Sequence, residues 1–533
     1  MANRAFTYTK MGKHNEAEVV EKEVLQIRRT VLGEQHPHTL GTVSNLAATY
    51  TSMGRHKEAE VLGKELDVIQ IRKTVLGEQH PDTLTSMSNH ASTYNEMGRY
   101  KEAEVLGKEV LQIRKTVLGE QHPDTLTSMS HLASVHTKIG RYKEAEVLRK
   151  DVLQFRKDVL GEQHPDTLTS MSHLASAYTN LGRYKEAEVL RKDVLLFRKA
   201  VLGEQHPHTL ALMSSLASTY SDMGRHIEAE ALGKEVVQLQ KIVLGEQHPN
   251  TLTSMNNLAL TYSNMGRYNE AEVLGKEVIQ IRKTVLGEQH PSTLTSTSNL
   301  ASTYSEMGRY GEAGVLGKEV LQSKKNVLGE QHPDTLASMS NLALNYSKMG
   351  RYDEAEVLEK NAFKFRKAVL GEQHPHTLTS MSNLAWTYLR MGKYTEAEVL
   401  EKEAMQIKNV VLREHHPNTL RSMNNLALVY YRMEKYKEAE VLGNDVVQIR
   451  KTVLGEQHPD TLISLANLTL TYLKMGRYNE AETLGKEVVR IRSTVFGERH
   501  PNTLRSMSTL AVIYSQMGRN TEAEVLQKQI KML

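Results

Sequence analysis

The chain has 533 residues, a formal net charge of +4 and no cysteine. The absence of cysteine excludes disulfides, thiolate zinc ligands and a cysteine nucleophile. So small a net charge argues against a dedicated nucleic-acid binder. No apolar run reaches the length of a membrane span, and the first ten residues contain no signal-peptide core. We therefore expect a cytoplasmic protein that binds neither nucleic acid nor membranes.

The pentad Gly-Glu-Gln-His-Pro occurs ten times, and two variants of it occupy residues 413–417 and 497–501. A fixed period of this size indicates a repeat array, whose core grows by stacking, so that its length does not force a division into domains. The twelve pentads contain every proline of the chain, spaced by 42 residues from Pro81 onward: Pro37, Pro81, Pro123, Pro165, Pro207, Pro249, Pro291, Pro333, Pro375, Pro417, Pro459 and Pro501.

Two helices are predicted in each repeat, and residues 124–165 show the pattern. Apolar residues recur at steps of three and four on either side of Gly140, which ends the first helix, helix A. Asp124 is expected to cap helix A, because it follows Pro123 and carries a side-chain acceptor. The second helix, helix B, ends at Gly161. No alternating strand pattern occurs, so we predict an all-α solenoid of antiparallel helix pairs with a 42-residue period.

Glycines occupy three kinds of position in the repeat: the A–B turn, the end of helix B, and the middle of helix B. Glu434 replaces a turn glycine and Arg413 replaces a glycine at the end of helix B; if these sites need a positive φ, each costs roughly 1 kcal/mol. A mid-helix glycine also costs about 1 kcal/mol against alanine. Either a neighbouring helix approaches closely there, or helix B is soft. The seven mid-helix positions are Gly63, Gly107, Gly233, Gly275, Gly317, Gly443 and Gly485.

The motif Asn-Leu-Ala-x-x-Tyr-x-x-x-Gly-Arg-Tyr-x-Glu-Ala, which runs from Asn299 through Gly308 and Tyr310 to Ala313, resembles the tetratricopeptide repeat (TPR). The 42-residue length with Val-Leu-Gly-x-x-His-Pro resembles the kinesin light chain and nephrocystin-3 subtype, and similar arrays form the C-terminal sensor of some STAND-type NTPases. The resemblance implies a right-handed superhelix, with helix A lining a concave groove and helix B on the convex back. The heptad coiled coil that precedes the repeats of a kinesin light chain is absent here.

The whole chain, 1–533, is predicted to be a single TPR solenoid. Residues 1–37 form an incomplete first repeat, 38–81 a repeat with two extra residues, 82–501 ten repeats of 42, and 502–533 an incomplete last repeat. We expect the extra residues, near Leu66–Ile71, to form a bulge in helix B or to alter its last turn. Because neither end resembles a polar cap, we expect a fragment, a truncated reading frame, or an array whose ends pair with something.

One position of helix A, just before a core leucine, is mostly asparagine. A ladder of amides offers donors and acceptors to an extended peptide, or it bonds within the stack, since side-chain amides often bond nearby backbone. Both interpretations stay open at this stage. The asparagines are Asn45, Asn89, Asn257, Asn299, Asn341, Asn383, Asn425 and Asn467.

The two halves of the chain differ at the neighbouring positions of helix A. The first half has serines, such as Ser176 and Ser218, whereas residues 334–517 have apolar and basic side chains, with Leu389, Tyr431 and Leu473 one turn further on. We predict an apolar, basic groove in the second half that holds an extended acidic peptide with an apolar anchor. The residues assigned to it are Asn341, Asn383, Asn425, Asn467, Leu344, Trp386, Leu428, Leu470, Tyr431, Lys348, Arg390, Arg432, Lys474, Arg421 and Arg505.

Trp386, the only tryptophan, is the key residue of this groove. Tryptophan and arginine are favoured residue types at binding hot spots. The alternative is that Trp386 and the leucines only seal adjacent A helices, because apolar patches on repeat surfaces serve either purpose.

The pentad histidines do not suggest a metal site. Consecutive repeats stack about 10 Å apart, too far for two such histidines to share an ion at about 2 Å. We interpret these histidines as loop residues that define helix ends, and the recurring methionines, such as Met129, as core. No phosphate-binding loop, nucleophile elbow or HExxH motif occurs. We therefore expect no catalytic residue, no metal and no cofactor.

These features favour a non-enzymatic scaffold that binds a protein or peptide in its concave groove. Two alternatives are a ligand-sensing regulatory array of a larger STAND-type NTPase and a structural array that stacks end to end through uncapped terminal repeats.

Overall fold

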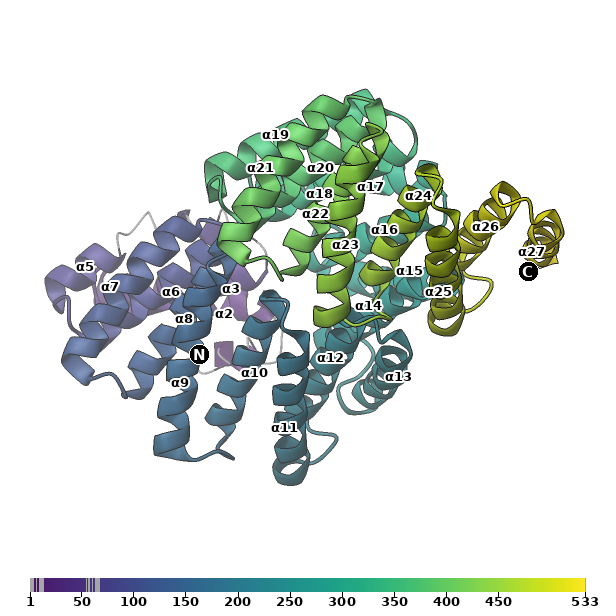
Figure 1. Cartoon of the computed structure of the whole chain (residues 1–533). Coiled ribbons are helices and arrows are strands. Elements are labelled where there is room, and N and C mark those ends of the chain that lie inside the picture. Colours follow the sequence, from purple (N-terminus) through teal and green to yellow (C-terminus); the bar gives the residue numbers. More distant parts are fainter. Residues whose placement is uncertain are drawn as a thin grey trace. The chain divides into compact units, whose positions relative to one another are not determined.

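The computed structural model describes residues 4–5, 7–8, 14–53, 55, 58–59, 61–62 and 68–532, and every regular element in these ranges is an α-helix (Figure 1). The all-α prediction and the succession of helix pairs are confirmed. The helices are α2 (His14–Leu32), α3 (Pro37–Ser52), α5 (Val68–Val75), α6 (Pro81–Glu96), α7 (Tyr100–Leu118), α8 (Pro123–Ile139), α9 (Tyr142–Leu160), α10 (Pro165–Asn180), α11 (Tyr184–Leu202), α12 (Pro207–Asp222), α13 (His226–Val243), α14 (Pro249–Asn264), α15 (Tyr268–Leu286), α16 (Pro291–Glu306), α17 (Tyr310–Leu328), α18 (Pro333–Lys348), α19 (Tyr352–Leu370), α20 (Pro375–Met391), α21 (Tyr394–Leu412), α22 (Pro417–Arg432), α23 (Tyr436–Val453), α24 (Pro459–Lys474), α25 (Tyr478–Phe496), α26 (Pro501–Gln516) and α27 (Asn520–Met532).

Each A helix begins at the proline of a pentad, and the histidine before that proline is its N-cap. In α8, His122 has extended backbone angles and its Nδ1 accepts a hydrogen bond of 3.2 Å from the backbone N–H of Asp124. Pro123 at the first helical position loses nothing, because that N–H has no partner within a helix. The assignment of the cap to Asp124 was therefore wrong, since Asp124 already lies inside the helix. The interpretation of the histidines as helix-end residues is confirmed.

The turn and loop glycines have positive φ, for example 82° at Gly140 and 86° at Gly161. Arg413 and Glu434 replace such glycines and keep the same region, with φ of 77° and 61°. The condition set for these two sites, a positive φ, is therefore met, and the cost of roughly 1 kcal/mol at each stays a prediction.

The core runs from one repeat to the next. Leu126, Met129 and Leu132 of α8 pack against Leu111 of the preceding helix, α7, and Val152 of the following helix, α9. The pair α8–α9 therefore buries its apolar face partly against the preceding repeat, as expected for a solenoid.

The mid-helix glycines among the described residues lie under a leucine of the next helix A, and Gly63 lies outside these residues. A Cβ on Gly275 would lie 3.5 Å from Leu300 Cδ1, and one on Gly317 would lie 3.1 Å from Leu342 Cδ1. The neighbouring helix therefore meets these glycines through a leucine side chain, and the choice between close backbone approach and a soft helix B stays open. The bulge predicted near Leu66–Ile71 falls largely outside the described residues; α5 begins at Val68.

Contacts between Cα atoms group the chain into two compact units, neither of which is contiguous in sequence. The assignment of the whole chain to a single solenoid stays a prediction. The first unit comprises Met1–Asn180, Leu286–Leu294 and Val320–Leu336, and the second comprises Leu181–Val285, Thr295–Glu319 and Ala337–Leu533.

Within each unit, residues 236 positions apart meet. His332 Nε2 lies 3.3 Å from the carbonyl oxygen of Glu96 in the first unit, and His458 Nε2 lies 3.1 Å from that of Asp222 in the second. Nδ1 of each histidine already accepts the cap hydrogen bond, so the proton sits on Nε2 and is donated to the carbonyl. The same histidine therefore caps its own helix and hydrogen-bonds to the end of a helix A that lies more than five repeats earlier in the sequence.

A pair of glycine substitutions should measure this long-range contact. Gly224 and Gly350 both occupy A–B turns, with φ of 73° and 78°. A Cβ on Gly224 would overlap Pro459 Cδ, whereas one on Gly350 meets nothing within 4 Å. Both alanine variants should lose roughly 1–2 kcal/mol for the left-handed backbone, and Gly224→Ala should lose more. Thermal unfolding gives the difference, and hydrogen exchange at the start of α24 should rise only in Gly224→Ala. Equal effects of the two substitutions would contradict the contact.

Candidate functional site

A cavity of about 480 Å³ lies along four successive A helices of the second unit, α20, α22, α24 and α26, with α25 contributing from behind. Repeat stacking places the same helix position side by side, so residues 42 apart in sequence line one surface. The lining residues are Trp386, Arg390, Asn424, Asn425, Leu428, Tyr431, Arg432, Ile463, Ala466, Asn467, Thr469, Leu470, Gly485, Val488, Arg492, Asn502, Arg505, Ser506 and Thr509.

The structure brings nine of the fifteen sequence-predicted residues together around this cavity. They are Trp386, Arg390, Asn425, Leu428, Tyr431, Arg432, Asn467, Leu470 and Arg505.

The other six lie apart from the cavity lining. Asn341, Leu344 and Lys348 are on α18, where Lys348 Nζ forms an ion pair of 2.7 Å with Glu306. Arg421 and Lys474 are exposed at the start of α22 and the end of α24. Asn383 is on α20, where its amide reaches a buried acid described below.

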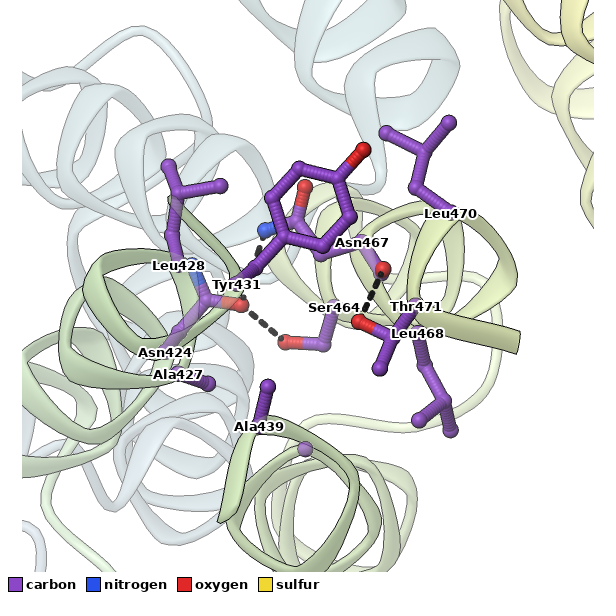
Figure 2. A pocket seen from close by; sticks show the side chains of 11 residues that line it. Asn424, Ala427, Leu428, Tyr431, Ala439, Ser464, Asn467, Leu468, Leu470 and Thr471 are labelled. Atoms are coloured by element: carbon purple, nitrogen blue, oxygen red, sulfur yellow. Dashed lines mark hydrogen bonds between the residues drawn. The ribbon is translucent and has the colours of Figure 1, made fainter. Parts of the chain in front are cut away.

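The asparagine ladder is engaged within the stack. Asn467 Nδ2 donates to Asn424 Oδ1 over 3.3 Å, and Ser464 Oγ donates to the same oxygen over 3.0 Å (Figure 2). Asn257 and Asn341 donate over 3.5 Å to serine hydroxyls of the preceding A helix. For these residues the interpretation of bonding within the stack is confirmed, and their binding of a peptide stays a prediction.

Figure 2 also shows how Leu428, Tyr431 and Leu470 lie around this hydrogen-bonded group. Leu428 and Tyr431 come from α22 and Leu470 from α24. All three side chains are half-buried, so they close the gap between the two helices and still present apolar surface to the larger cavity, which they also line.

Trp386 takes part in packing between helices, and its role as a ligand anchor stays a prediction. It packs against a buried cluster that contains Leu389, Ala397 and Val429, and it also lines the cavity. Leu389 is only 6% exposed. Its expected place in the groove was therefore wrong, because its side chain points into the packing between α20 and the neighbouring helices. Leu473 is half-buried against the core of the last repeats.

The lining is basic. Arg390, Arg432 and Arg505 are exposed, Arg492 is buried, and no aspartate or glutamate is among the lining residues. The guanidinium of Arg432 lies 5.9 Å from the centre of the Tyr431 ring, within the range of a cation–π contact. Several positive charges in a partly desolvated cleft raise the affinity of that cleft for anions.

An equivalent cavity of about 180 Å³ lies between α12 and α14 and has the opposite character. Its lining includes Ser218 where the larger cavity has Trp386, Asp222 where it has Arg390, and Asn264 where it has Arg432. No lysine or arginine is among its lining residues. Burial raises the pKa of Asp222 to about 6.

Sequence reasoning missed Ile463, Arg492 and Thr509. Ile463 is 42% exposed and stands where the other repeats have threonine, alanine, glycine or arginine, a substitution that the sequence shows plainly. Arg492 belongs to a basic position present in nearly every repeat, so its sequence gives no sign that it reaches the cavity.

Three buried acids, Glu21, Glu359 and Glu401, lie on the helix-B position that is glycine in most repeats, and the last two belong to the second unit. Glu359 accepts hydrogen bonds from Ser340 Oγ over 3.2 Å and from Asn383 Nδ2 over 3.4 Å. Burial raises the pKa of Glu359 to about 7, against the opposing charge of Arg366.

In the next repeat, Glu401 accepts from Ser382 Oγ over 2.9 Å, and Lys408 donates to the same hydroxyl over 2.7 Å. Burial raises the pKa of Glu401 and lowers that of Lys408 to about 8. Such buried pairs are costly to break, because removing one partner leaves an uncompensated charge.

Among the described residues, no group of three or more histidine, aspartate or glutamate side chains is placed to bind a metal ion. In the same residues, no helix combines the length and apolar character needed to cross a bilayer.

The titration of Glu359 should make the second unit more stable as the pH falls. Because its folded pKa of about 7 lies above the ordinary 4.5, its contribution is complete below the unfolded pKa and is lost as the pH rises through the folded value. Glu359→Gln should therefore exceed the parent protein in stability by about 2 kcal/mol near pH 8 and nearly match it near pH 5. Urea unfolding at the two pH values measures this, and a difference independent of pH would contradict it.

The comparisons with known proteins agree with this architecture. A family model described as "Tetratricopeptide repeat" matches overlapping segments that span residues 1–368 and 402–530, and a second model of the same description matches 377–418. No curated protein matches the chain.

Solved structures give partial matches. Two crystal structures of a Podosopora anserina protein, described as a kinesin light chain with nearly identical TPR-like repeats, are 33% identical and cover 38% of this chain and 97% of their own. Their TM-scores are 0.34, for a form with one substituted residue, and 0.33. BtubC (BKLC) from P. vanneervenii is 21% identical, covers 45% of this chain and 90% of its own, and has a TM-score of 0.34. Since the family model matches almost the whole sequence, the chain belongs to the tetratricopeptide repeat family, whose arrays are typically protein–protein interaction scaffolds.

Proposed function

We propose that this chain is a non-enzymatic scaffold that binds an extended segment of a partner protein in the cavity along α20, α22, α24 and α26. The segment carries an apolar anchor and acidic side chains. One observation carries the proposal: the lining combines Trp386, Leu428 and Leu470 with four arginines and no carboxylate.

The apolar part of the lining suits a single large side chain. The cavity volume of about 480 Å³ falls within the range of about 300–1,000 Å³ typical of ligand pockets. Trp386 is fixed by its packing on the α20–α22 cluster, so it offers a wide surface at little cost in conformational entropy. Ile463 adds exposed apolar surface on α24.

The charged part selects an acidic ligand. Arg390, Arg432 and Arg505 are exposed, so an approaching acidic segment meets attraction before it docks. Complementary charge raises the association rate and excludes basic segments. A neutral or basic segment would leave the arginines of the cleft without a partner.

An extended conformation follows from the repeat spacing. Neighbouring helices pack about 8–10 Å apart, and an extended chain rises about 3.3 Å per residue. A segment crossing the four A helices therefore offers roughly three residues to each repeat, and side chains on one face meet successive helices in turn.

Changing three residues should abolish binding while leaving the fold intact. Trp386→Ala combined with Arg390→Glu and Arg432→Glu should weaken binding of a short fluorescent peptide, one leucine among glutamates and aspartates, by far more than tenfold, because each change removes a hot-spot contact or reverses an attraction. Far-UV circular dichroism should be unchanged, since both arginines are exposed. Fluorescence anisotropy measures the affinity.

A matched control variant lies in the equivalent cavity of the same unit. Ser218→Ala with Asn264→Glu alters the positions that correspond to Trp386 and Arg432 and should leave the affinity as it is. Unchanged affinity in the triple variant would refute the groove, and an equal loss in the control would show that the effect is not local.

A further inference from the structure

The α26 end of the cavity holds two arginines. Arg492 of α25 is 5% exposed; its Nη1 donates to the carbonyl of Asn502 over 3.0 Å and to Ser506 Oγ over 2.5 Å, and its Nη2 donates to the carbonyl of Leu462 over 3.1 Å. Its buried Nε has no hydrogen-bond partner among the described residues. All of the acceptors are neutral, so this buried guanidinium carries a charge that its hydrogen bonds do not compensate.

Some equivalent cations face an acid, although for Arg198 and Arg282 the second residue of the next helix A is His208 or Ser292. Arg114 and Arg450 donate to the carbonyl of the second residue of the next helix A, and that residue is an aspartate, Asp124 or Asp460. The aspartate charge favours the charged form of each arginine. At α26 the same place holds Asn502, so the acid is missing.

A second cation is added at the same end. Most repeats have a small residue at the fifth position of helix A, whereas α26 has Arg505, which is exposed and lines the cavity beside Arg492. Burial and the charge of Arg505 lower the pKa of Arg492 to about 10. The two cations therefore repel each other, and an anion between them would relieve that repulsion.

One other repeat has an arginine at this position, and it contains its own carboxylate. Arg421 of α22 lowers the pKa of the buried Lys408, and the buried Glu401 opposes that effect. Glu401, Lys408 and Arg421 each lie 84 residues before Gly485, Arg492 and Arg505. The place of Glu401 is thus taken by a glycine that lines the cavity.

We propose that Arg492 and Arg505 form an oxyanion subsite, open at Gly485 and bordered by Ser506 and Thr509, that binds a carboxylate or phosphate group on the docked peptide. The proposal rests on the proposed function and adds a position of specificity to it. Glu401 in its own repeat is the internal counterpart of the group that the ligand supplies here. The hydroxyls of Ser506 and Thr509 donate to the carbonyls of Asn502 and Arg505, so the guanidinium groups supply the donors to either kind of oxyanion.

Substitution of Gly485 by glutamate should fill the subsite from within. A Cβ at Gly485 would lie 3.4 Å from Leu510 Cδ1, a contact that a small shift accommodates. The matched control is Gly275→Glu, which has 3.5 Å to Leu300 Cδ1 and adds the same charge at the equivalent position five repeats earlier in the sequence. Arg505→Gln removes the exposed cation and leaves the buried one in place.

Three versions of the acidic peptide, with glutamate, phosphoserine or glutamine at the end nearest α26, test the subsite by fluorescence anisotropy. The parent protein and Gly275→Glu should prefer an anionic version over glutamine by about tenfold, and the stronger of the two identifies the group. Arg505→Gln and Gly485→Glu should bind all three versions alike, with the anchor contribution of Trp386 retained. A preference that survives in both variants would overturn the subsite while leaving the groove in place.

Inorganic phosphate tests the subsite even if no peptide binds. A ligand that binds only the folded state raises its thermal midpoint. Phosphate should raise the thermal midpoint of the parent protein and of Gly275→Glu above the midpoint in chloride at equal ionic strength. It should raise the midpoint of neither Arg505→Gln nor Gly485→Glu. An equal response in all four proteins would overturn the subsite, and loss of peptide binding with a selective phosphate response would reject only the proposed function.

Discussion

The packing of one helix pair on the next is the constraint on which the structure depends. Leu300 and Leu342 lie directly over Gly275 and Gly317 of the preceding helix B, and the core around Met129 draws on three successive helices. Because every repeat completes its core only with its neighbours, the position of any side chain follows from its place in the 42-residue period. Lines of equivalent residues then form continuous surfaces along the A helices.

The repeats depart from the common sequence period at the proposed groove and in the two repeats before its α26 end. The helix-B position under the leucine is glycine in most repeats, but it is a buried acid at Glu359 and Glu401. The position is glycine again at Gly443 and Gly485, and at Gly485, in the repeat of the second cation Arg505, the cavity is open and basic. The same backbone therefore presents a closed, internally neutralised surface at one repeat and a surface suited to an anionic ligand two repeats later. In the equivalent cavity, Asp222 and serines leave the surface polar.

Most of the fold could be predicted from the sequence, because helix periodicity, turn glycines and prolines are local signals. The cap was misassigned since both His122 and Asp124 carry acceptors, and only the extended backbone at His122 decides between them. The contact between residues 236 apart depends on the rotation accumulated over many repeats, which no local pattern specifies. Nine candidate site residues lie together because they share helix positions. Leu389 faces the core instead. Arg492 was missed because nearly every repeat has a lysine or arginine at its position, so that its sequence does not distinguish it.

The single tryptophan allows the most direct measurement of groove occupancy. Trp386 is half-buried at the cavity wall, so its fluorescence reports on that wall without interference from any other indole. Titration with a peptide that carries a leucine among acidic residues should shift the emission to shorter wavelengths as the anchor excludes water. The midpoint of the titration should move to higher peptide concentration as salt screens the arginines. An emission spectrum unchanged at saturating peptide, or a shift produced equally by a basic peptide, would contradict the account.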